Sequence, residues 1–287
     1  MKNNIAKKML AAFALVILAG TLAVSVPVRV YQLIHDIDFS SGFFISRGGA
    51  YNNLLVSVVA ASIVLFIVTI ILVSQKKEQL ATAPRYKAGN YVWCGILCAA
   101  GTASLVNVGI RVREGATTLA EWILVSLLIL NIFALAYLAY SACKKKAPGA
   151  ADAFYLVPTA YTAMLLITKF LAFTSILTIS EHSLDVLSLS SLILFLLFRF
   201  SYTRESVKIT KFKTKILSEI FAFAGTVLGA VAYIPRIIVF FIGSPAAKEY
   251  IVLPTIWELA VLCFALYCAL TAAFSSITRS KNDNRAA

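Results

Sequence analysis

Eight long apolar segments constrain the fold of this chain more than any other feature. They cover residues 9–31, 53–74, 91–112, 119–143, 153–178, 184–203, 214–242 and 254–278. Each is close to the roughly 20 residues that an α-helix needs to cross a bilayer. A backbone in the hydrocarbon core must satisfy its own hydrogen bonds, and the segments lack the alternation of barrel strands. The sequence therefore predicts an all-α, polytopic transmembrane bundle of about eight helices.

The basic residues are unevenly divided between the two sides of this bundle. With the N-terminus inside, the inner segments hold 19 of the 26 Lys and Arg residues and 5 of the 13 Asp and Glu residues. This asymmetry follows the positive-inside rule and predicts that both termini are cytoplasmic. It also accounts for the net charge of +13 without a nucleic-acid partner. We expect a multi-pass protein of a bacterial cytoplasmic membrane, embedded in the lipid bilayer.

The chain is predicted to be a single integral membrane domain over residues 1–287, because no gap between apolar segments could hold a folded soluble domain. Two halves, 1–146 and 147–280, show short similarities, such as ILCAAGT at 96–102 against IFAFAGT at 220–226. Two parallel four-helix repeats would have this form. Chance similarity between apolar helices is the alternative, because such helices share a small set of residue types.

The two ends of the chain are interpreted from their composition. The basic start followed by an apolar stretch resembles a secretory signal, but the apolar stretch is long enough to span a membrane. A retained first helix is therefore favoured over a cleaved signal. Residues 281–287 are expected to form a polar tail.

The seventh apolar segment carries small residues at helical spacing. They fall at intervals of three and four residues, which places them on one face of a helix that ends at an arginine: Ser218, Ala222, Gly225, Gly229, Ala232 and Arg236. Small faces allow transmembrane helices to approach closely. Gly225 and Gly229 are therefore predicted to be helix-packing positions.

Six charged residues are predicted at a common level near the outer ends of their helices. They are Arg29, Arg111, Lys169, Arg236, Glu121 and Glu258. Ionisable side chains inside a membrane are costly unless they are paired or hydrated, so they mark candidate functional sites. We hypothesise a mostly basic pocket that binds an anionic small molecule or a lipid headgroup, because Arg and Lys recognise carboxylate and phosphate.

Each of these charges also has a structural interpretation. Lys169 can extend to the outer interface, and Arg236 can lie at a helix end within that interface. Glu121 and Glu258 fall at predicted helix N-termini, where the helix dipole favours carboxylates. The neighbouring Trp122 and Trp257 are typical of the interfacial belt. In the functional alternative, Glu258 pairs with Arg236 or Lys169 and leaves one cation for a ligand.

The first outer loop contains a weak metal-binding candidate. Asp36 and Asp38 resemble the Asp-x-Asp pairs of some enzymes that act on lipid-linked sugars, but a solvated loop is the simpler interpretation. The five cysteines lack neighbouring histidines and are interpreted as packing residues. The sequence contains no nucleophile elbow, zinc-peptidase pair, P-loop or dinucleotide fingerprint. No cofactor is therefore expected, and an enzymatic role is disfavoured.

Residues 27–44, with their acidic residues and a Gly-Phe-Phe turn after the first helix, resemble uncharacterised multi-pass membrane proteins of anaerobic bacteria. The resemblance implies a membrane-embedded fold and no activity. Three functional classes therefore stay open. The first is a small transporter-like or ligand-binding protein. The second is a membrane-embedded assembly subunit with a protein partner or a second copy of itself, and the third is a lipid-modifying enzyme.

Overall fold

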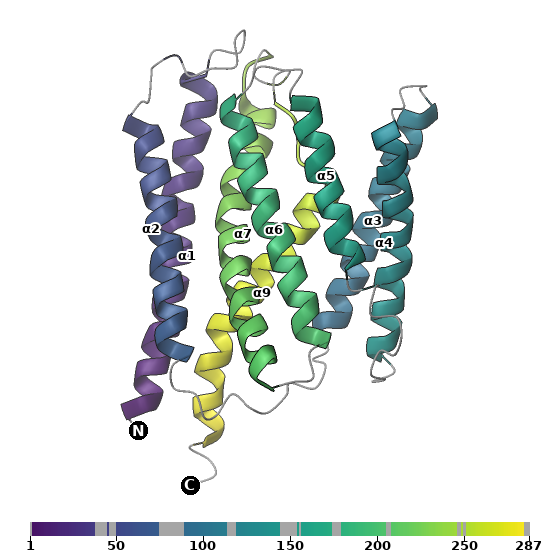
Figure 1. Ribbon diagram of the computed structural model, residues 1–287. Coiled ribbons are helices and arrows are strands. Elements are labelled where there is room, and N and C mark those ends of the chain that lie inside the picture. The colour runs from purple at the N-terminus through teal and green to yellow at the C-terminus, as the bar shows by residue number, and fades with distance from the viewer. Residues whose placement is uncertain are drawn as a thin grey trace.

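The chain folds into long helices that run up and down through one bundle (Figure 1). In this computed structural model the described residues are 2–37, 45, 50–74, 89–113, 119–143, 154, 156–173, 179–204, 208–245, 248 and 251–283. The helices within them are α1 (Lys2–His35), α2 (Ala50–Ser74), α3 (Gly89–Arg113), α4 (Leu119–Cys143), α5 (Val157–Phe173), α6 (Ile179–Arg204), α7 (Lys208–Ile242) and α9 (Ile256–Asp283).

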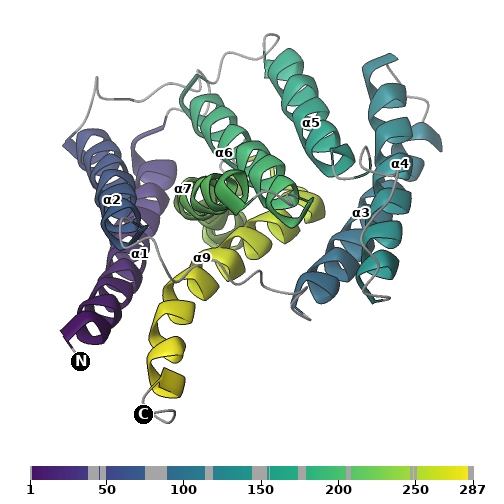
Figure 2. The same ribbon diagram turned by 60° about the horizontal axis from the view of Figure 1, so that its bottom comes forward.

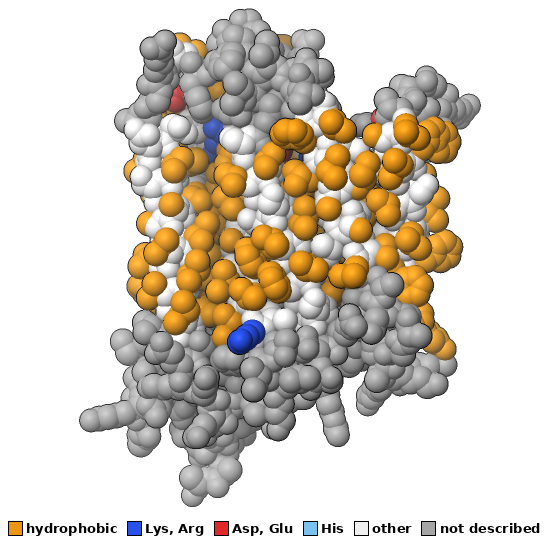
Figure 3. Space-filling model, viewed as in Figure 1, with side chains coloured by type: hydrophobic (Ala, Val, Ile, Leu, Met, Phe, Trp, Pro, Cys, Tyr) orange, Lys and Arg blue, Asp and Glu red, His pale blue; other side chains and the backbone are white. Residues whose placement is uncertain are grey.

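Six of the helices in the described ranges are long and apolar enough to cross a membrane. They are α1, α2, α3, α4, α6 and α7, whereas α5 and α9 contribute shorter apolar segments at 157–171 and 256–271. Hydrophobic side chains cover the middle of the visible surface (Figure 3). The predicted all-helical bundle is confirmed within the described ranges, and six of its helices have the length and composition of membrane spans.

The helices are arranged around α7. This helix packs against α1, α2, α6 and α9, while α3 and α4 form a pair at the edge of the bundle (Figure 2). Helix α5 connects that pair to α6, and α9 crosses the bundle obliquely to reach α3. The beginning of α1 and the end of α9 lie at the same end of the bundle (Figure 1).

The small face of α7 is buried inside the bundle. All six of its residues are buried, from Ser218 to Arg236. A Cβ on Gly225 would lie 2.9 Å from Leu192 Cδ2 of α6, and one on Gly229 would lie 2.8 Å from Leu262 Cδ1 of α9. These glycines allow two neighbouring helices to approach α7 more closely than a larger residue would permit.

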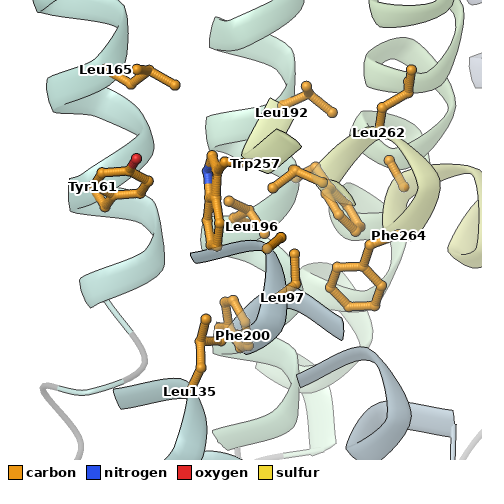
Figure 4. Close-up of a cluster of buried hydrophobic side chains, with 14 of the residues drawn as sticks. Leu97, Leu135, Tyr161, Leu165, Leu192, Leu196, Phe200, Trp257, Leu262 and Phe264 are labelled. Carbon is orange, nitrogen blue, oxygen red and sulfur yellow. The ribbon is translucent and has the colours of Figure 1, made fainter. Parts of the chain in front are cut away.

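The opposite face of α7 packs against the α1–α2 pair. Phe223 of α7 stacks on Phe66 of α2 with ring centroids 3.8 Å apart, and Val227 and Val231 extend the same apolar cluster. A larger cluster joins α3, α4, α5, α6 and α9 to Ala222, Ala232 and Tyr233 of α7, and it includes Trp257 (Figure 4). Two faces of one helix therefore hold the two sides of the bundle together.

The predicted four-helix repeat receives no support from the packing. In a repeat of two halves, α2 and α3 would correspond to α6 and α7. Helices α6 and α7 pack along each other, whereas α2 and α3 lie at opposite sides of the bundle in Figures 1 and 2. The two halves of the chain are therefore packed differently.

Candidate functional site

Two ion pairs lie in the half of the bundle away from the helix ends marked N and C in Figure 1. Lys169 near the end of α5 pairs with Glu258 in the first turn of α9. Arg236 near the end of α7 pairs with Asp185 in the second turn of α6. Each pair therefore joins two helices, and ionisable groups in an apolar bundle are expected to pair in this way.

The carboxylate of Glu258 accepts four hydrogen bonds. Oε1 lies 2.5 Å from Lys169 Nζ and 3.3 Å from the hydroxyl of Tyr233. Oε2 lies 2.7 Å from the backbone nitrogen of Thr255 and 2.8 Å from its hydroxyl. Both oxygens are fully hydrogen-bonded, as a carboxylate with 0% exposure requires.

Local sequence places Glu258 in this position. Thr255 directly precedes α9, and its hydroxyl accepts from the backbone nitrogen of Glu258 at 3.3 Å. A Thr followed three residues later by a Glu is a capping box, in which the two residues satisfy each other's backbone donors. Such a cap stabilises a helix N-terminus by about 1 kcal/mol. This terminus lies inside the bundle, below the ends of α6 and α7 (Figure 1).

Arg236 and Asp185 form a more enclosed pair. Arg236 NH1 lies 3.0 Å from Asp185 Oδ2, to which it donates a hydrogen bond, and 2.9 Å from Oδ1. The contact with Oδ1 is an ionic contact without the alignment of a hydrogen bond. The two side chains are 3% and 4% exposed. This pair is therefore shielded on all sides, whereas the side chain of Lys169 is 15% exposed.

Two hydroxyl groups connect the ion pairs. The hydroxyl of Tyr233 donates to Glu258 and accepts from Ser188 Oγ at 3.2 Å. Ser188 Oγ also lies 3.1 Å from the main-chain oxygen of Asp185, so it has two alternative acceptors for one proton. These contacts form one continuous row across α5, α9, α7 and α6. The row consists of Lys169, Glu258, Tyr233, Ser188 and the main-chain oxygen of Asp185. We call it the hydroxyl row.

Trp257 fixes α9 against α5 next to this row. Its indole nitrogen donates to the hydroxyl of Thr162 at 3.1 Å, and its ring packs edge-on to Tyr161 with centroids 5.1 Å apart. Figure 4 shows the indole standing between Tyr161 and Leu196. The interpretation of Trp257 as an interfacial belt residue is wrong, because the side chain is fully buried. Trp122, by contrast, is 50% exposed.

Arg29 is buried on the opposite side of α7. Its guanidinium donates to the side-chain oxygen of Gln32 at 3.0 Å, one turn further along α1. Both residues are almost fully buried. Helices α1 and α5 lie on opposite sides of α7 in Figures 1 and 2, so Arg29 and Lys169 belong to helices on different sides of α7.

Of the other predicted site residues, the structure describes the side chains of Glu121 and Asp36. Glu121 is partly exposed in the first turn of α4, which packs against α3 and α5 at the edge of the bundle. Arg111 belongs to α3, but its side chain is outside the described part of the structure. The carboxylate of Asp36 is partly exposed and Asp38 is not among the described residues. The described side chains include no group of three metal-ligating residues.

Sequence reasoning overlooked Asp185, Tyr233 and Ser188. The sixth apolar segment begins at residue 184, so the sequence places Asp185 at the edge of that segment. The structure begins α6 at Ile179, which brings Asp185 inside the helix. The spacing of three residues between Asp185 and Ser188 was the available signal, since it places both on one face of the helix. Comparisons with protein-family models, with curated proteins and with solved structures find no match for this chain.

In this half of the bundle Arg29 and Arg236 are buried, whereas Lys169 is partly exposed. The described contacts of the Lys169 ammonium use one of its three N–H groups, for Glu258. Lys169 is also the most exposed member of the two pairs. The arrangement can therefore offer charged N–H donors to an anion at one place, beside α5.

Proposed function

We propose that this protein is a small transporter-like or ligand-binding protein that takes up an anionic small molecule or lipid headgroup in the extracytoplasmic half of a bacterial cytoplasmic membrane. In this proposal all eight helices cross the membrane, and both termini are cytoplasmic. The positive-inside distribution of Lys and Arg supports the orientation. The common location of the ends of α1 and α9 is consistent with an even number of crossings (Figure 1).

The observation that carries the proposal is the Lys169–Glu258 pair. A buried ion pair contributes little stability compared with apolar residues of the same shape, so its presence in a membrane bundle points to a functional role. Lys169 combines a charge with partial exposure and remaining N–H donors. An anion that reaches Lys169 takes the place of Glu258 as its partner. Arg236 forms the second ion pair with Asp185, to which the hydroxyl row extends.

The proposal is tested by binding measurements on the purified protein in nanodiscs of zwitterionic lipid. Sulfate, a short-chain alkyl sulfonate and phosphatidylglycerol are compared by the thermal shift that each produces, with phosphatidylcholine as the neutral reference. Sulfate or the sulfonate indicates a small-molecule site, and a shift with phosphatidylglycerol alone indicates a lipid headgroup. We expect the shift to be lost in the double variant Lys169→Met/Glu258→Gln, which leaves no buried charge unpaired.

The matched control is Lys215→Ala. Lys215 pairs with Glu219 on the other half of α7, and both side chains are partly exposed. This variant loses one positive charge far from the candidate site and should keep the full thermal shift. An unchanged shift in both the Lys169→Met/Glu258→Gln and the Arg236→Met/Asp185→Asn variants would exclude the proposed site.

The other two classes have less support. An assembly role for the small face of α7 requires that face to be exposed to lipid, and Gly225 and Gly229 are instead buried against α6 and α9. Docking of a membrane-protein partner or a second copy would have to use other surfaces. A lipid-modifying activity depends on Asp36 and Asp38, and the second of these lies outside the described residues.

A further inference from the structure

We propose that anion binding at Lys169 is coupled to the uptake of one proton by Glu258, so that the anion and the proton bind together. This inference rests on the proposed function and names the ion to which it is coupled. In the ligand-free state Lys169 and Glu258 neutralise each other. When Lys169 turns to an anion, Glu258 loses its only charged partner among the donors that contact it. A fully buried carboxylate without a counter-charge is strongly disfavoured, and protonation removes that charge.

The proton balance of this step is simple. One proton from solvent forms an O–H bond on Glu258, and no other covalent bond forms or breaks. Lys169 keeps its ammonium charge and moves a hydrogen bond from Glu258 to the anion. The site therefore gains one anion and one proton, and its net charge is unchanged. Transport by such a site would carry the anion and the proton in the same direction.

The hydroxyl row is built to serve both protonation states of Glu258. In the ionised state Ser188 donates to Tyr233, and Tyr233 donates to Glu258. In the protonated state Glu258 donates to Tyr233, Tyr233 donates to Ser188, and Ser188 donates to the main-chain oxygen of Asp185, 3.1 Å away. The same oxygen–oxygen distances fit either direction, because each hydroxyl both donates and accepts. Every O–H proton of the row has an acceptor in both states.

The neighbouring charges favour Glu258 over Asp185 as the proton acceptor. Both oxygens of Asp185 contact Arg236, which keeps its charge at all relevant pH values, and that pair is 3–4% exposed. Glu258 depends on Lys169, whose side chain is 15% exposed and can reach a ligand. The enclosed pair therefore stays intact while the more open pair exchanges its partner.

The surroundings of Glu258 contain few other groups that titrate. Helix α5 brings Tyr161 beside Trp257, and α7 brings Tyr233. Helix α1 contributes Arg29, which donates to Gln32 of its own helix. The described ionisable side chains of α3 are thiols, and one of them, Cys98, contacts the carbonyl of Ile132 of α4. Among the described groups, Glu258 is the one whose partner is both charged and replaceable.

Isothermal titration calorimetry in buffers of different ionisation enthalpy measures the protons taken up per anion. The probe is an alkyl sulfonate, whose own charge is constant over the pH range. For the wild-type protein we expect one proton per anion and an affinity that falls about tenfold for each unit of rising pH. Glu258→Gln, which keeps the capping box because Gln also serves at that position, should bind the sulfonate more tightly, without proton uptake and without pH dependence.

Glu219→Gln is the matched control, because it removes a carboxylate from the partly exposed Lys215–Glu219 pair. It should bind the sulfonate with the wild-type proton count. Sulfonate binding by the wild type without proton uptake would overturn the coupling and leave the proposed function in place. Absence of binding to both the wild type and Glu258→Gln, with sulfate and phosphatidylglycerol equally inactive, would overturn both.

Discussion

The indole nitrogen of Trp257 donates to the hydroxyl of Thr162, and the next residue, Glu258, pairs with Lys169. Two consecutive residues of α9 thus hold two positions of α5 that lie seven residues apart. That separation corresponds to about 10 Å along the helix axis. The first turn of α9 is therefore attached to α5 by one neutral and one charged contact, and the two contacts can be removed separately.

Replacing Trp257 with Phe removes the neutral contact while it retains an aromatic ring. The hydroxyl of Thr162 still donates to the main-chain oxygen of Pro158, so the buried group keeps one partner. We expect a loss of about 1 kcal/mol from the hydrogen bond and somewhat more from the smaller ring. The measurement is unfolding in a mild detergent. Trp122→Phe is the control and should have little effect, because that side chain is half exposed.

Removing the charged contact has a larger effect. Lys169→Met leaves Glu258 buried without a counter-charge, which typically costs about 3–5 kcal/mol. Adding Glu258→Gln should restore most of the loss, because it removes the orphaned charge. A double-mutant cycle on thermal unfolding gives the coupling energy. Additive effects of the two substitutions would show that the side chains do not interact in the folded protein.

The close approach of helices at Gly225 provides a prediction about packing. Any side chain there meets Leu192, which is itself fully buried and has little room to move. We expect Gly225→Leu to destabilise the protein by about 3 kcal/mol, at the upper end of the range for overpacked cores. Gly95→Leu is the matched control on another helix, since no atom lies within 4 Å of a Cβ built there. Equal stability of the two variants in a thermal unfolding assay would contradict the packing described for α7.

The sequence predicts the helices well because their signal is local. Apolar segments of membrane-spanning length identify the described helices. The spacing of small residues correctly predicts that Ser218 to Arg236 share one packed face of α7. The capping box formed by Thr255 and Glu258 is also visible as a sequence pattern.

The pairing of charges could not be predicted in the same way. Lys169 and Glu258 are 89 residues apart, and Arg236 and Asp185 are 51 apart, so their contacts depend on how the helices pack. The burial of Trp257 has the same origin. A helix that begins inside the bundle has the local sequence of one that begins at the membrane surface, and only its neighbours distinguish the two.

The hydroxyl row predicts a specific effect of Ser188→Ala. In the ionised state this change removes one weak donor to Tyr233, so the ligand-free protein should unfold at nearly the wild-type temperature. In the protonated state Tyr233 loses the acceptor for its own proton, and a buried donor without a partner is costly. We expect alkyl sulfonate affinity to weaken by about tenfold, as measured by calorimetry. A wild-type affinity would mean that the row does not reverse.

Asn131 is the polar member of a buried stripe on α4 whose other members are Leu124, Leu128, Ala134, Leu135 and Leu138. Its side-chain oxygen and nitrogen are fully buried, and neither has a hydrogen-bond partner within the described part of the protein. Burial of such an amide typically costs about 1–3 kcal/mol, and leucine has a similar size. We therefore expect Asn131→Leu to raise the free energy of unfolding by about 1 kcal/mol or more.

The measurement is thermal or denaturant unfolding of the Asn131→Leu variant in the same detergent as the wild type. Leu128→Asn is the reverse change one turn away in the same stripe, and it should destabilise the protein by a comparable or larger amount because it adds a second buried amide. A loss of stability in Asn131→Leu would contradict the assignment of Asn131 as unsatisfied. It would indicate that the amide holds a polar group, such as a buried water, which contributes to the stability of α4.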